Sequence, residues 1–166
     1  MKLFVYGGAI LLIIPFQVVV IHQFAIGSIV PDSILLTICL VGLWRGKLEA
    51  VVLGIGLGFL QDLLSGSMLW VNLITKPLIG LAAGVWGRTV LSLTSWIIPI
   101  FVMGISFISN LLVLVFFKIH SPEMDIIRAF FGTFLPQVLY DGVFGAIVLL
   151  AVFLLFPTLY RNVRNL

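Results

Sequence analysis

Three ionisable residues stand inside apolar stretches of this chain and are the first candidates for chemistry. Asp62 lies within FLQDLLSGSMLW, residues 59–70, while Lys76 and Asp141 lie in two further apolar runs. Ionisable side chains are costly in hydrocarbon, so they usually face protein or water and pair with something. Two interpretations stay open from this pattern: a structural ion pair, or a site that binds a ligand or a proton.

The surrounding composition is that of a membrane protein. Of the 166 residues, 62% are hydrophobic and only 9% are charged, and the mean hydropathy is +1.31. These values exclude an ordinary soluble domain. Because a spanning helix needs about 20 residues, the chain has room for roughly six crossings and little else. We expect an all-α integral membrane protein of about six transmembrane helices, forming a single polytopic domain over residues 1–166.

Polar residues divide the chain into six apolar segments. They lie at about 3–21, 32–44, 48–64, 70–87, 91–117 and 128–156. The first could imitate a signal peptide, but it is longer than a usual signal sequence and contains Pro15, so we expect a spanning helix. Pro99 and Pro136 could bend the last two. Basic residues are more numerous in the connections on one side, which predicts that both termini are cytoplasmic.

The spacing of small residues indicates where the charges point. Gly54 and Gly58 precede Asp62 at intervals of four residues, and Gly80 and Gly84 follow Lys76 in the same way. Residues four apart share one face of a helix, and glycines on that face let two helices approach closely. Each charge is therefore predicted to face a neighbouring helix and not lipid.

Distances along the helices place these charges at similar depth. Asp62 lies 13 residues after Glu49, and Lys76 lies 12 residues before Arg88. At helical rise both positions are about 20 Å from the inner surface. We predict that Asp62 and Lys76 are near neighbours and that Asp141 and Asn72 complete an intramembrane polar cluster.

Two shorter features look like helix ends. Ser65, Gly66 and Ser67 can turn the chain and satisfy helix-end polar groups, which predicts the outer corner between the third and fourth helices. Asp32 follows a proline at the start of the second segment and is predicted to cap that helix.

Other kinds of chemistry have little support in the sequence. There is no G-x-S-x-G, H-E-x-x-H or P-loop motif, so we expect no catalytic residue and no cofactor. Cys39 is the single cysteine, and His22 and His120 are isolated, so no metal site is expected. The net charge of +3 comes largely from helix ends and does not indicate nucleic-acid binding.

Residues 30–87 resemble a known family, the rod-shape-determining protein MreD of bacteria. The features that carry the resemblance are Pro31-Asp32 opening a short helix, Trp44-Arg45-Gly46 at a basic corner, and GxxxGFLQDLLSGS over residues 54–67. The chain length and the six-segment hydropathy agree with it. The chain differs from the family pattern at Trp70 and at Lys76-Pro77.

The resemblance implies a non-enzymatic scaffold of the cell-elongation complex in the inner membrane. Its implied partners are an MreC-type membrane protein and, through it, the MreB filament, RodA and a class B penicillin-binding protein. The implied fold is similar to the substrate-binding subunits of energy-coupling-factor vitamin transporters. A vitamin-binding transporter subunit is therefore the alternative function, with the polar cluster lining its pocket. A proton-coupled carrier is a third possibility. It has the least support, because the sequence shows no internal repeat.

Overall fold

The computed structural model describes residues 8, 21–27, 29–65, 70–92, 97–123 and 125–155. The first predicted segment lies almost entirely outside these residues, as do Gly66 and Ser67. Apart from one isolated bridge between Ile26 and Ile29, the regular structure that they contain is helical. In chain order the elements are η2 (Ile21–Phe24), α2 (Ser33–Arg45), α3 (Lys47–Ser65), α4 (Val71–Ser92), α5 (Ile97–His120), α6 (Ile126–Ala129), η3 (Phe130–Phe134) and α7 (Leu135–Leu155).

The elements α6, η3 and α7 follow one another without a break. The short segment η3 is π-helical, and the N–H of Leu135 donates to the carbonyl of Phe130, five residues earlier. Pro136 then lies in the first turn of α7, where the structure passes directly from the π-helical turn into α-helix. The bend or interruption that the sequence allowed at this proline is therefore a change of helical type within one continuous helix, residues 126–155.

Three helices in the described part of the chain are long and apolar enough to cross a bilayer. They are Lys47–Ser65, Ile97–His120 and Ile126–Val148, and two shorter apolar helices are Ser33–Arg45 and Val71–Gly87. The all-helical, apolar character predicted from the composition is thus present. These residues show three helices of spanning length where the sequence predicted about six over the whole chain.

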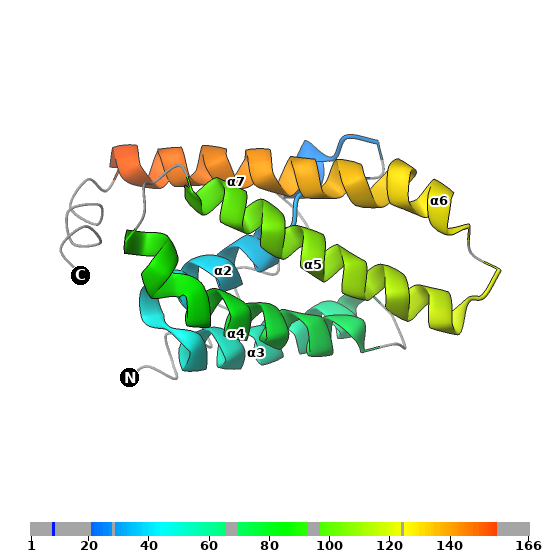
Figure 1. Ribbon diagram of the computed structural model, residues 1–166, viewed down its shortest axis with the longest axis horizontal. Helices are drawn as coiled ribbons and strands as arrows, with labels where there is room; N and C mark the ends of the chain where they lie inside the picture. The colour runs from blue at the N-terminus through cyan, green and yellow to red at the C-terminus, as the bar shows by residue number, and fades with distance from the viewer. Residues whose placement is uncertain are drawn as a thin grey trace.

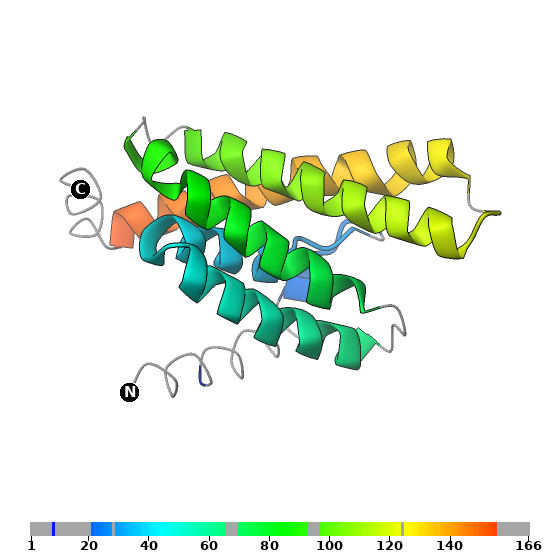
Figure 2. The ribbon, with the colours of Figure 1, turned by 60° about the horizontal axis from the view of Figure 1, so that its bottom comes forward.

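The helices are arranged in two parts (Figure 1). Helices α2, α3 and α4 pack together in one group, which we call the body, and α5 pairs with the continuous helix 126–155 in a hairpin, which we call the arm. One end of the molecule holds the last turn of α2, which ends at Arg45, and the start of α5. The other end holds the last turn of α3, which ends at Ser65, and the turn of the arm. We name them the Arg45 end and the Ser65 end. At the Ser65 end the arm extends past α3 and α4 (Figure 2).

Glycines bring α3 and α4 into backbone contact. A Cβ placed on Gly54 would lie 2.7 Å from the carbonyl oxygen of Lys76, and one placed on Gly80 would lie 2.6 Å from that of Ala50. Gly58 and Gly84 have equally little room, the first against Asn72 and the second against Lys47. Real Cβ atoms do not come so close to a backbone atom, so the two glycine stripes found in the sequence meet each other inside the body.

The apolar core lies around α2. Its buried members are Ile34, Leu35, Leu36, Ile38 and Cys39 of α2, Leu53 and Leu57 of α3, Ile79 and Ala83 of α4, and Val102 and Ile105 of α5. Cys39 is fully buried and packs as a small apolar residue. A second cluster at the Arg45 end joins Leu43 of the body to Ile98 of the arm. Both parts of the molecule therefore contribute to the core.

Candidate functional site

The candidate site is built around the start of α2, which lies inside the bundle. Residues 29–32 are not helical, and the Asp32 carboxylate accepts a hydrogen bond from the N–H of Leu35 at 2.7 Å. A carboxylate at this position satisfies a free amide and is favoured by the helix dipole. Non-helical backbone inside an apolar bundle needs partners for its remaining polar groups. Such partners come from the arm, and α4 provides the cation that binds the carboxylate.

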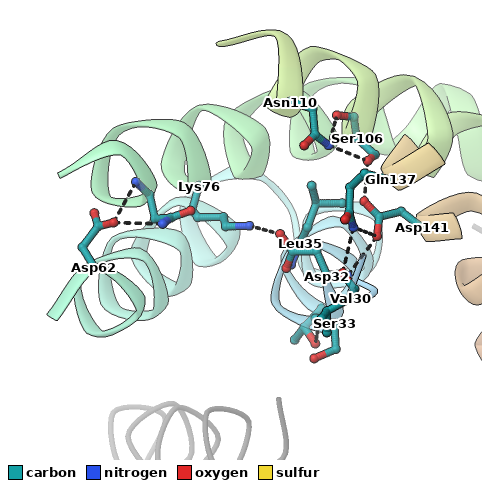
Figure 3. A network of polar contacts seen from close by, with 12 residues as sticks. Val30, Asp32, Ser33, Leu35, Asp62, Lys76, Ser106, Asn110, Gln137 and Asp141 are labelled. Carbon is teal, nitrogen blue, oxygen red and sulfur yellow. Dashed lines mark hydrogen bonds and ion pairs between the residues drawn. The ribbon is translucent and has the colours of Figure 1, made fainter. Parts of the chain in front are cut away.

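Lys76 binds the same carboxylate from α4. Its side chain is only 2% exposed, and its ammonium forms an ion pair with Oδ2 of Asp32, leaving Oδ1 for the amide of Leu35 (Figure 3). The ion pair of Lys76 is thus with Asp32 and not the one predicted with Asp62. The reason is the direction of the side chain: Lys76 lies more than one turn into α4 and extends toward the first turn of α2, as Figure 3 shows.

Asp62 acts on the beginning of α4 instead. It is 2% exposed, and its Oδ1 accepts from the backbone N–H of Asn72 at 3.2 Å and from the side-chain amide at 2.9 Å. Its Oδ2 accepts from the N–H of Leu73 at 2.8 Å. A carboxylate on α3 therefore supplies the capping bonds of the neighbouring helix, where the positive end of the helix dipole favours an anion.

Asp141 of α7 is buried like Asp62, at 3% exposure. Its Oδ1 accepts from the N–H of Asp32 and from the side-chain amide of Gln137, both at 2.9 Å. Its Oδ2 accepts from the hydroxyl of Ser106 at 2.5 Å, and Asn110 donates to that hydroxyl oxygen at 3.2 Å. Asp141 consequently connects both helices of the arm to the start of α2.

The structure divides the predicted cluster into two groups. Asp62 and Asn72 lie together at the Ser65 end of α3 and α4. Lys76 and Asp141 both bind Asp32, Lys76 at its carboxylate and Asp141 at its backbone N–H (Figure 3). We call the second group the polar network; its members are Asp32, Lys76, Ser106, Asn110, Gln137 and Asp141. It joins the body to the arm.

Sequence reasoning missed three members of the polar network. Ser106 and Asn110 are four residues apart on α5, and Gln137 and Asp141 are four residues apart on α7. Pairs of polar residues at this interval lie on one helix face, and in an apolar segment such a face is expected to meet protein. This spacing was the signal available in the sequence.

The geometry of these groups favours a structural role. Each carboxylate oxygen of Asp32, Asp62 and Asp141 accepts from a named donor of the chain. No group of three or more His, Cys, Asp or Glu side chains that could hold a metal occurs in the described ranges. The predicted turn is represented by Ser65, whose hydroxyl donates to the carbonyl of Asp62 at 3.2 Å.

Comparison with known proteins adds the family. The family described as rod shape-determining protein MreD matches residues 2–159, which is nearly the whole chain. The chain belongs to the MreD family. Members of the MreD family are structural proteins that determine rod shape, so membership indicates a role of this chain in rod-shape determination. No curated protein and no solved structure matched the chain.

Proposed function

We propose that this chain is a non-enzymatic scaffold of the cell-elongation complex that makes peptidoglycan, and that it docks other membrane proteins. The observation that supports it most is that the charged side chains inside the bundle bond to other groups of the same chain. Lys76 and the carboxylates of Asp32, Asp62 and Asp141 bond to helix ends and to one another, so these charged groups have partners inside the chain. A protein whose costly polar groups bond to its own helices, and not to a substrate, is suited to a structural role as a scaffold.

The packing of the glycines bears on where a partner docks. Gly54, Gly58, Gly80 and Gly84 each lie against the backbone of the neighbouring helix in the body. No second helix can approach the same face. We therefore assign docking to other helix faces, which are apolar and exposed on both parts of the molecule, as at Val52 of α3 and Val115 of α5.

The scaffold proposal includes a location in the membrane, a fold and a set of partners. The protein lies in the cytoplasmic membrane with about six crossings, with both termini in the cytoplasm and the Ser65 end outside. The bundle is proposed to be similar to the substrate-binding subunits of energy-coupling-factor transporters. The proposed direct partner is an MreC-type protein, which would link the scaffold to the MreB filament, RodA and a class B penicillin-binding protein.

Co-purification tests this proposal. The full chain, extracted in mild detergent from cells of a rod-shaped host, should recover an MreC-type protein in stable ratio. Asp62→Ala should give rounded cells at normal protein levels if the capping of α4 supports the scaffold. Asp62→Asn, which keeps one acceptor oxygen for the amides of Asn72 and Leu73, is the matched control and should leave the cells rod-shaped. Recovery of an ATPase pair in place of the MreC-type protein would contradict the scaffold.

A vitamin-binding transporter subunit remains the second candidate, and one observation favours it. In the described residues the buried oxygens Gln61 Oε1 and Thr75 Oγ1 have no hydrogen-bond partner, and Thr75 is next to Lys76. Buried polar atoms without a partner are costly, so a bound molecule could satisfy them. Native mass spectrometry of the purified protein would detect a retained small molecule. Its presence at one per chain would favour transport over the scaffold.

A further inference from the structure

The body and the arm are held by contacts of different kinds. In the body, α3 and α4 touch backbone to backbone at the four glycines, so neither helix can shift without a collision. The arm is different: a Cβ placed on Gly142 of α7 would meet the side chain of Met103, which is flexible and can move aside. The close fit that fixes the body is absent at this point of the arm.

Three side chains on one face of α7 bind a stretch of chain that is mostly non-helical. Gln137 donates to the carbonyl of Val30 at 2.8 Å, the Tyr140 hydroxyl donates to the carbonyl of Phe24, and Asp141 accepts from the N–H of Asp32 at 2.9 Å. All three partners are main-chain atoms. The main chain at Phe24, Val30 and Asp32 therefore receives from α7 some of the hydrogen bonds that a regular helix would have made internally.

The attachment of the arm changes along its length. At the Arg45 end it is apolar and aromatic, with Ile98 packed on Leu43 and the ring of Phe101 set edge-on to Trp86 at 6.3 Å between centroids. In the middle it includes the polar network. At the Ser65 end the arm extends beyond the body, and Ile127 and Phe131 are 72% and 63% exposed. Polar contacts thus separate a packed end from a free end.

We propose that the arm pivots on its apolar contacts at the Arg45 end, and that Gln137, Tyr140 and Asp141 form a latch. The latch holds the arm against the main chain at Phe24, Val30 and Asp32. Release of the latch moves the Ser65 end of the arm away from α4, while the glycine contact keeps α3 and α4 together. Such a movement changes the surface available at the Ser65 end. This inference concerns the motion of the chain and does not depend on the identity of any partner.

Spin labels on the full chain in lipid nanodiscs test the latch. One pair of single cysteines reports on the Ser65 end, Ile74→Cys with Phe131→Cys, and a second reports on the Arg45 end, Val85→Cys with Ile147→Cys. All four positions are exposed, and the buried Cys39 is replaced by Ala in every sample. The latch is weakened by Gln137→Leu with Tyr140→Phe. Leu139→Ala, an exposed position on the same turn, is the matched control.

The latch variant should lengthen the Ser65-end distance by about 5 Å or more, the scale of a one-turn displacement, in a large fraction of molecules. The Arg45-end distance and the Leu139→Ala sample should stay as in the parent chain. Unchanged distances in both pairs would overturn the proposal, and so would equal lengthening of both pairs, which indicates general loosening.

If the double variant does not fold, Tyr140→Phe alone decides, because it removes one hydroxyl and should still raise the longer-distance population measurably. No increase would overturn the latch.

Discussion

Two contacts in this molecule hold neighbouring segments together in opposite ways. One joins α3 to α4, and the other joins α7 to the main chain at Phe24, Val30 and Asp32. In the first, side chains are removed: glycines let two backbones touch. In the second, side chains are extended: Gln137, Tyr140 and Asp141 reach across to main-chain atoms. The first contact is specified by steric exclusion and the second by hydrogen bonds. The difference predicts that substitutions in the two regions will fail for different reasons and by different amounts.

The largest effect is expected where the body has no free volume. Gly58→Leu would place its side chain on the backbone of Asn72, and overpacking of about 3 kcal/mol or more should prevent α3 and α4 from associating. The measurement is the yield of monodisperse protein in detergent. Gly104→Leu is the control, because a Cβ there meets nothing within 4 Å. Equal yields for the two variants would show that the body is not held by this contact.

Removal of the buried cation should have the next largest effect. Lys76→Met leaves the Asp32 carboxylate without its ion-pair partner in the bundle, which should cost about 3 to 5 kcal/mol in unfolding free energy. Thermal unfolding in detergent measures the loss. Adding Asp32→Asn should recover part of it, whereas adding Asp62→Asn should not. If Asp62→Asn gave the recovery instead, Lys76 would pair with Asp62, as the sequence predicted.

The capping of α4 by Asp62 is expected to contribute less. Asp62→Ala removes the acceptor for the amides of Asn72 and Leu73, at a cost of about 2 kcal/mol, the upper part of the range for a helix cap. Asp62→Asn keeps one acceptor oxygen and should cost less than half as much. Hydrogen exchange at the first turn of α4 locates the effect. Protection that is lost throughout the body would argue against a local cap.

The smallest effect is expected in the arm. Ser106→Ala removes one hydrogen bond to Asp141, which keeps its bonds to Asp32 and Gln137. Hydrogen bonds between membrane helices are worth about 0.6 to 2 kcal/mol, so the melting temperature should fall only slightly. Ser109→Ala, one turn away on α5 and also buried, is the comparison. A loss as large as that of Lys76→Met would show that the arm is as tightly specified as the body.

This contrast explains what could be predicted from the sequence. The three central helices were expected at 32–44, 48–64 and 70–87, and α2, α3 and α4 begin within about three residues of those positions, as hydropathy permits. The glycine stripes have a fixed interval of four residues, so their shared face could be predicted. Contacts that depend on short-range periodicity were therefore accessible before the structure.

The partner of Lys76 was not accessible in the same way. Equal depth of Asp62 and Lys76 along their helices suggested a pair, but depth does not fix the direction of a side chain around its helix. The actual partner, Asp32, is 44 residues away and occupies its position because α2 begins inside the bundle. That start depends in turn on Asp141, 109 residues away. Long-range contacts of this kind have no local pattern.

The position of Asp32 has a consequence for biosynthesis. Its carboxylate needs Lys76, and its amide needs Asp141, and both are translated after it. When Asp32 leaves the ribosome, neither partner has yet left it, and unpaired polar groups in a bilayer are costly. The segment around Asp32 must therefore wait at the membrane surface, in water or with an insertion factor until later helices arrive. α2 is therefore made before the helices that partner it, and it reaches its final state only after α7 has been made.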